Sequence, residues 1–333
     1  MTSYQVMTNR EFDGRHNVLS QMSYSYNEKD GDLMEVSEIR SASYSPSGVA
    51  RQQDIVTFAD ADRTQILEIK HIENSGIYSN GNVGTSDIKI YKNITNLDAL
   101  KTGADIMMSG LEEYQHITTS KFDVRGNAID QEIVKTYYRA DGTQLGTKDK
   151  QVIHNLDTYT IHDRPLDTTI ANYEVSLNAD THLEEEAFTD IQKIHTLASD
   201  YDRYGNAEHQ TIDTFDDLAM PLTSLVSHKD IVNNYGQPGQ MVTILLADGV
   251  NTTQKEATFV RKKGNAITST VVETDKDGAL IQRTVTTTSL FDYRGNAVDQ
   301  STDKKVLDKV TLSEKLVTTT QIHNSDIDGR GDA

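Results

Sequence analysis

The sequence predicts an all-β protein: an elongated array of about ten two-stranded repeats, arranged as a β-hairpin stack or β-solenoid with a period of about 35 residues. Two observations carry this prediction. A ten-residue pattern recurs along the chain, and the segments between its copies are rich in Val, Ile and Thr. An isolated hairpin is only marginally stable in water, so units of this kind become stable by stacking on one another.

Three closely similar segments define the pattern. Each has an aromatic anchor followed by Asp, with Gly and Asn four and five residues after the anchor: Phe122, Asp123, Gly126, Asn127, Tyr201, Asp202, Gly205, Asn206, Phe291, Asp292, Gly295 and Asn296. Weaker copies are anchored at Phe12, Tyr44, Ile77, Ile161, Tyr235, Val260 and Ile327. Nine residues after five of the ten anchors stands a glutamine, namely Gln21, Gln53, Gln131, Gln210 and Gln300. This offset was not used to find the copies, so it supports a true repeat.

The chemistry of the motif indicates a hairpin turn. The anchor is expected to be buried at the end of a strand, and the Asp is expected to accept hydrogen bonds from backbone amides two residues on. Gly and Asn are both expected to take the left-handed backbone conformation that other residues resist. The small residue that follows lets the next strand pack closely, and the glutamines are expected to form an amide ladder between adjacent repeats.

A second type of turn falls about midway between anchors. It is marked by Asp-Gly pairs, a typical hairpin-turn dipeptide, at residues 30–31, 141–142, 248–249 and 277–278. Each unit therefore reads as turn, strand, turn, strand. Residues 183–197 have the composition of a helix but occupy the place of a strand, and a strand is predicted there. The whole chain, 1–333, is expected to be one continuous array with longer loops at 96–110 and 178–187, no separate catalytic domain and no capping repeat.

Charge and composition exclude several classes of function. The 333 residues carry a formal net charge of −19, which is incompatible with neutralising a nucleic-acid backbone or docking on anionic lipid. No stretch of the chain is long and apolar enough for membrane insertion. The chain has no cysteine, which excludes thiol chemistry and suits an exported protein.

The motif resembles the YD repeats of the RHS and teneurin class, in which a Tyr-Asp-x-x-Gly-Asn or Gly-Arg turn recurs in two-stranded units. The segments that begin at Phe122, Tyr201 and Phe291 carry this resemblance. This resemblance implies a long spiralling sheet, and it indicates no active site. The period here is longer, and Thr-rich strands replace the usual Tyr-rich half. The chain is also similar to the repetitive segments of giant bacterial surface proteins.

No catalytic or metal-binding signature accompanies the repeats. The ten histidines have no zinc-ligand spacing, and no nucleophile elbow or phosphate-binding glycine loop occurs. We therefore expect no enzyme activity and no cofactor. The weak calcium candidates are Asp30, Asp32, Asp275 and Asp277, which alternate around turn glycines without completing a calcium loop. A hairpin turn with exposed acids is the favoured interpretation of both segments.

The sequence favours a structural role as a segment or subunit of an extracellular filament, stalk or giant surface protein. The expected partners are copies of the chain placed end to end, or further repeats of the same longer chain. The expected location is extracellular or at the cell surface, in a bacterium. Two alternatives remain: an adhesin or glycan-binding array that uses Tyr78, Tyr159 and Tyr173, and a toxin-enclosing shell of the RHS type.

Overall fold

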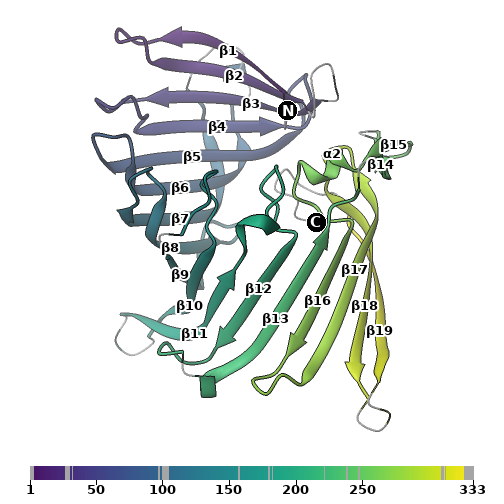
Figure 1. Cartoon of the computed structure of the whole chain (residues 1–333). Coiled ribbons are helices and arrows are strands. Elements are labelled where there is room, and N and C mark those ends of the chain that lie inside the picture. Colours follow the sequence, from purple (N-terminus) through teal and green to yellow (C-terminus); the bar gives the residue numbers. More distant parts are fainter. Residues whose placement is uncertain are drawn as a thin grey trace.

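The computed structural model describes residues 4–26, 31, 33–96, 98–99, 105–156, 158–178, 181, 183–220, 222–237, 239–246, 248–308, 311 and 313–325. They form an all-β structure with one open sheet of nineteen strands (Figure 1). The predicted all-β class is confirmed. Helix is limited to short segments, among them α2 (Thr258–Arg261) and the 3-10 turns at Ala198–Asp200 and Leu222–Ser224. No helix of the described residues is long and apolar enough to cross a membrane.

The strands follow one another along the chain with short connections. They are β1 (Tyr4–Phe12), β2 (Val18–Tyr26), β3 (Leu33–Ala42), β4 (Gln52–Phe58), β5 (Ile66–Ile77), β6 (Val83–Ile94), β7 (Met108–Phe122), β8 (Ala128–Tyr138), β9 (Gln144–Asn155), β10 (Asp167–Leu177), β11 (Glu184–His195), β12 (His209–Phe215), β13 (Leu225–Asn234), β14 (Met241–Leu245), β15 (Thr252–Glu256), β16 (Thr268–Thr274), β17 (Leu280–Asp292), β18 (Ala297–Leu307) and β19 (Glu314–His323). β11 confirms the strand predicted over 183–197. β7 and β11 include the last residues of the two predicted long loops.

Strand pairing follows chain order. From β1 to β13, each strand pairs antiparallel with the next. β13 then pairs with β16, and the meander continues through β17 and β18 to β19. β14 and β15 form a side hairpin, in which β14 pairs in parallel with the last residues of β17. Within the described residues, β1 and β19 are the outer strands of the meander, and β15 pairs only with β14 in the side hairpin.

The sheet is a single layer, and its core is divided into separate clusters. The sheet twists and coils, so that the strands near the N-terminus and those near the C-terminus form two differently oriented halves (Figure 1). One cluster gathers buried residues of β3, β4 and β5 under Ile106 of the loop before β7. A second packs β14 and α2 against Phe291, and a third joins β10, β11 and β12. Apolar burial is therefore local, and most polar side chains lie on the two faces of the sheet.

Candidate functional site

The turn between β17 and β18 shows the geometry of the motif. The N–H of Asp292 donates to the carbonyl of Asn296 (2.8 Å), and the N–H of Gly295 donates to the carbonyl of Asp292 (2.9 Å). The same two bonds close six other turns along one rim of the sheet, at residues 13–17, 45–49, 78–82, 123–127, 160–164 and 202–206. We call these seven the motif turns, and the row of strand ends that they join the motif rim. The fourth residue of each motif turn has a positive φ between 60° and 100°.

The aspartate of the motif closes the turn with its carboxylate. One oxygen of Asp292 accepts the N–H groups of Arg294 (2.9 Å) and Asn296 (2.7 Å), and the other accepts the side-chain amide of Asn296 (3.0 Å). Asp13, Asp123 and Asp202 make the same three bonds. At Asp13 the amide of Asn17 is the main reason that the pKa of the carboxyl lies below its usual value.

Two details of the motif differ from the sequence-based expectation. The motif asparagines are not left-handed: among the described residues, the non-glycine residues with positive φ are His16, Ser43, Arg63, Asp163 and Met220. The asparagine instead keeps a backbone conformation from which its amide reaches the aspartate. The predicted amide ladder between glutamines is also wrong. Each in-register glutamine donates across its motif turn to the side chain of Asn9, Ser41, Thr119, Thr196 or Thr288.

Tyrosine anchors fix motif turns 45–49, 160–164 and 202–206 to the preceding turn. The hydroxyl of Tyr201 donates to the carbonyl of Pro165 (2.6 Å), six residues after the preceding anchor, Tyr159. Tyr44, Tyr159 and Tyr235 make the equivalent bond to Val18, Ala128 and Ala207. The anchor predicted at Ile161 is wrong, because that side chain is 87% exposed and Tyr159 occupies the anchor place of turn 160–164. The copy predicted at Val260 is wrong as a hairpin turn, because Val260 lies in α2.

Consecutive turns along the motif rim are also bonded directly to one another. Arg125 donates to the carbonyl of Thr160 (2.8 Å) and forms an ion pair with Asp163 (3.0 Å). Arg164 donates to the carbonyl of Asp202 (2.6 Å), and Asn206 donates to that of Arg261 (2.7 Å). Side chains of one turn therefore complete the hydrogen bonding of the next from turn 123–127 to turn 202–206, and Asn206 extends this stack to α2.

This stacking gives the glycine a second role in some of the motif turns, whereas a Cβ at Gly48 would meet no atom within 4 Å. A Cβ at Gly295 would lie 2.9 Å from Cγ of Lys263, and one at Gly205 would lie 3.2 Å from Nε of Arg164. These approaches are shorter than ordinary van der Waals contact. Glycine is therefore required by the positive φ and by the close approach of the neighbouring turn.

The opposite rim carries turns of the same backbone geometry that stand alone. In the turn between β16 and β17, Asp275 N–H donates to the Ala279 carbonyl (2.9 Å) and Gly278 N–H donates to the Asp275 carbonyl (3.0 Å). A Cβ at Gly278 or Gly142 would meet no atom within 4 Å. The Gly-Asn and Asp-Gly turns are thus one turn type in two different surroundings.

Most histidines of the chain belong to a pattern that the linear sequence hides. Six aspartate–histidine pairs stand directly opposite each other on neighbouring strands, and the strand register places all six on one face of the sheet. They are Asp54–His71, Asp87–His116, Asp130–His154, Asp167–His195, Asp213–His228 and Asp299–His323. Nδ1 of the histidine lies 2.5–2.7 Å from the aspartate oxygen in five pairs, and the sixth, Asp130–His154, is also bonded.

The environment of His71 changes its titration. Burial alone would lower the pKa of His71, but hydrogen bonds to Asp54 (2.6 Å) and Glu73 (3.0 Å) outweigh it and raise the pKa above its usual value. Sequence inspection missed these pairs because the partners are separated by 17 residues here and by 29 at Asp87 and His116.

A buried ionic cluster was also missed. Glu38 of β3 is fully buried and accepts hydrogen bonds from Arg10 of β1 (2.8 Å), Arg40 (3.2 Å) and Arg63. Arg63 has a φ of 58°, and it belongs to the loop that follows β4. The cluster ties the edge strand β1 and this loop to the face of β3.

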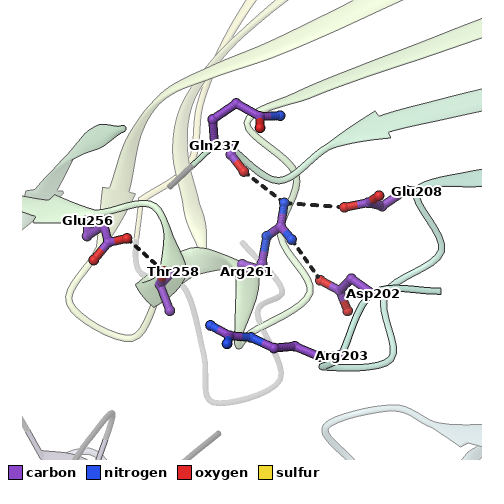
Figure 2. Close-up of a pocket in the computed structure, with 8 residues that line it drawn as sticks. Asp202, Arg203, Glu208, Gln237, Glu256, Thr258 and Arg261 are labelled. Atoms are coloured by element: carbon purple, nitrogen blue, oxygen red, sulfur yellow. Dashed lines mark hydrogen bonds and ion pairs between the residues drawn. The ribbon is translucent and has the colours of Figure 1, made fainter. Parts of the chain in front are cut away.

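One hollow among the described residues is polar and internally neutralised. It measures about 440 Å³ and lies beside motif turn 202–206. Figure 2 shows Arg261 at its centre, donating to the carbonyl of Gly236 (2.8 Å) and forming ion pairs with Glu208 (3.3 Å) and Asp202 (3.6 Å). The arrangement holds α2 against two neighbouring turns, and at the side of the hollow the hydroxyl of Thr258 donates to Glu256 (3.2 Å).

The calcium candidates are not brought together in the part of the chain that the structure describes. Asp275 accepts the backbone N–H groups of Asp277 and Ala279 (both 2.9 Å), and Asp277 lies 3.1 Å from the ammonium group of Lys276. Asp30 and Asp32 lie outside the described residues. Among the described residues, no group of three or more His, Asp or Glu side chains is placed to hold a metal ion.

The tyrosines of the glycan-binding alternative are dispersed. Tyr78 packs edge-on against Phe122, with ring centroids 5.8 Å apart, and Tyr173 does the same against Phe188 at 5.7 Å. The hydroxyl of Tyr159 is bonded to the carbonyl of Ala128. Each of the three rings contributes to the packing or hydrogen bonding of its own hairpins.

Comparison with known proteins identifies no relative: no protein-family model and no curated protein matches the chain.

Proposed function

We propose that the chain is a structural repeat protein, a segment or subunit of an extracellular filament, stalk or giant surface protein. Its building unit is two strands joined by a turn, about 35 residues in length, and this unit is repeated along the chain. The observation that carries the proposal is the motif rim, where the successive turns between residues 123 and 206 complete the hydrogen bonding of one another. Such nearest-neighbour bonding suits a molecule whose function depends on length and continuity.

The use of the polar groups supports a role without catalysis. The motif aspartates, the in-register glutamines and Arg261 are hydrogen-bonded or ion-paired within the sheet. The open sheet supports the same proposal, because both ends of the described meander leave an edge that can bind further strands. Every side chain of β19 is exposed. A toxin-enclosing shell requires a closed sheet. The open sheet of the described residues therefore favours the filament over that alternative.

Negative-stain microscopy and sedimentation of the purified chain test the proposal. We expect elongated particles that associate through their edge strands as the concentration rises. Lysine substitutions at Val317 and Thr319 should suppress the association, because charges on an edge strand oppose strand addition. Compact particles that do not associate, with a melting temperature independent of concentration, would contradict a structural role.

A further inference from the structure

The outer edge of β19 carries a specific acceptor for one more strand. We propose that it binds a single antiparallel strand of the kind that follows a motif turn in this repeat, with a Gln, Thr or Ser side chain placed opposite Asn324. This inference deepens the proposed function and rests on it. The occupant is a further repeat of the chain; a second copy stacked in the same orientation does not fit, because its β1 would run parallel to β19.

One side-chain hydrogen bond recurs at all seven motif turns. The residue nine positions after the anchor donates to a side-chain oxygen on the strand before the turn, over 2.7–3.2 Å. The donors are Gln21, Gln53, Ser86, Gln131, Thr168, Gln210 and Gln300. The acceptors are Asn9, Ser41, Asn74, Thr119, Asn155, Thr196 and Thr288. The direction of donation is the same in every case.

Asn324 directly follows the end of β19 and occupies the position equivalent to the acceptors Asn74 and Asn155. Asn74 and Asn155 each use both ends of the amide: Nδ2 donates to the carbonyl of Ala50 (3.0 Å) or Ala128 (2.9 Å), and Oδ1 accepts from the following strand. Asn324 makes the first bond, from Nδ2 to the carbonyl of Ala297 (3.0 Å). No donor to its Oδ1 occurs among the described residues. Asn324 therefore presents an oriented acceptor at the outer edge of β19.

Strand direction identifies which kind of strand fits. The meander contains seventeen strands, the nineteen of the sheet less β14 and β15, and its neighbours are antiparallel throughout. An odd number means that β1 and β19 run in the same direction. A second copy stacked in the same orientation would thus pair its β1 in parallel with β19. It would also bring Asn9, an acceptor already occupied by Gln21, towards another acceptor. A strand that follows a motif turn runs in the required direction and carries the donor.

The chain supplies the probe for a test. Residues 298–307 of β18, appended after Ala333, place a copy of Gln300 nine residues after Ile327, which is the spacing at the motif turns. Hydrogen exchange of the backbone amides of β19 is then measured in the extended and unextended chains. We expect the extension to slow exchange at least tenfold across residues 314–323 and to leave β1 unchanged.

Variants of the extended chain test the side-chain bond. Replacing the appended Gln by Ala should reduce the protection of β19 roughly fivefold, the effect of one lost hydrogen bond. Asn324→Ala should do the same, whereas Asn324→Asp retains an acceptor and should preserve the protection. Equal exchange of β19 with and without the extension overturns the proposal, and so does an appended Gln→Ala variant as protected as its parent. An unextended chain that never associates, combined with a protected β19 in the extended chain, would contradict self-assembly while supporting this inference.

Discussion

The two ends of β17 carry the same five-residue turn in different surroundings. At the opposite rim, turn 275–279 stands alone, and a Cβ on Gly278 would meet open space. At the motif rim, turn 292–296 packs on Lys263, and its carbonyl at Gly295 accepts the amide of Asn265 (2.7 Å). The backbone bonds of the two turns agree within 0.1 Å. The difference shows that local turn chemistry forms the hairpins, whereas contacts between turns bind the hairpins to one another.

Removal of the closing aspartate should give the largest difference in stability loss between the motif rim and the opposite rim. Asp292→Ala leaves the N–H groups of Arg294 and Asn296 without their acceptor in a buried turn, and we expect a loss of about 3 kcal/mol in the free energy of unfolding. Asp275→Ala removes two similar bonds from an exposed turn that water reaches, with an expected loss of about 1 kcal/mol. Urea unfolding followed by circular dichroism measures both. Equal losses would mean that stacking adds nothing to the turn.

Replacing the turn glycine by alanine measures how closely the neighbouring segment packs on the turn. Both Gly295→Ala and Gly278→Ala place a side chain at positive φ, which costs about 1–2 kcal/mol. At Gly295 the new Cβ also meets Lys263, and overpacking adds about 1 kcal/mol or more. The same urea titration shows whether Gly295→Ala lowers the free energy of unfolding more than Gly278→Ala does. The Lys263→Gly background is the control, because it should reduce the cost at Gly295 and leave that at Gly278 unchanged.

The smallest expected effect is the pH dependence contributed by His71. Its pKa is raised in the folded chain, so its contribution to stability is complete below the unfolded pKa of about 6.5 and is lost as pH rises through the folded value. Between pH 6 and pH 8, we expect the free energy of unfolding of the wild type to fall further than that of His71→Gln, by less than about 1 kcal/mol. Thermal melts of both proteins at the two pH values provide the measurement. A wild-type difference no larger than that of the variant would contradict this assignment.

Local chemistry made the turns predictable from the sequence. The Asp-x-x-Gly-Asn spacing contains all the groups that close the turn at Asp123, so neighbouring residues were sufficient. The turn at 160–164 was misplaced because Asp163 takes the left-handed position with a φ of 60°, and the motif glycine is missing there. Strand composition likewise predicted the all-β class.

Cross-strand contacts were not predictable in the same way. The partner of His116 depends on the register between β6 and β7, and the length of the intervening loop sets that register. The cluster around Glu38 combines residues from β1, β3 and a loop. Stacking between turns depends on the coiling of the whole sheet. A single sequence does not show which residues of separate strands and loops come into contact.

Because the backbone ladders from β1 to β13 join each strand only to its neighbours along the chain, the molecule has a distinctive mechanical character. Tension applied at the two edge strands loads the outermost ladder first, and its bonds open one after another, as in a zipper. Each freed hairpin, such as β8 with β9, releases roughly 90 Å of chain before the next ladder bears the load. A protein of this design would lengthen in steps under pull and recover its length when the tension falls.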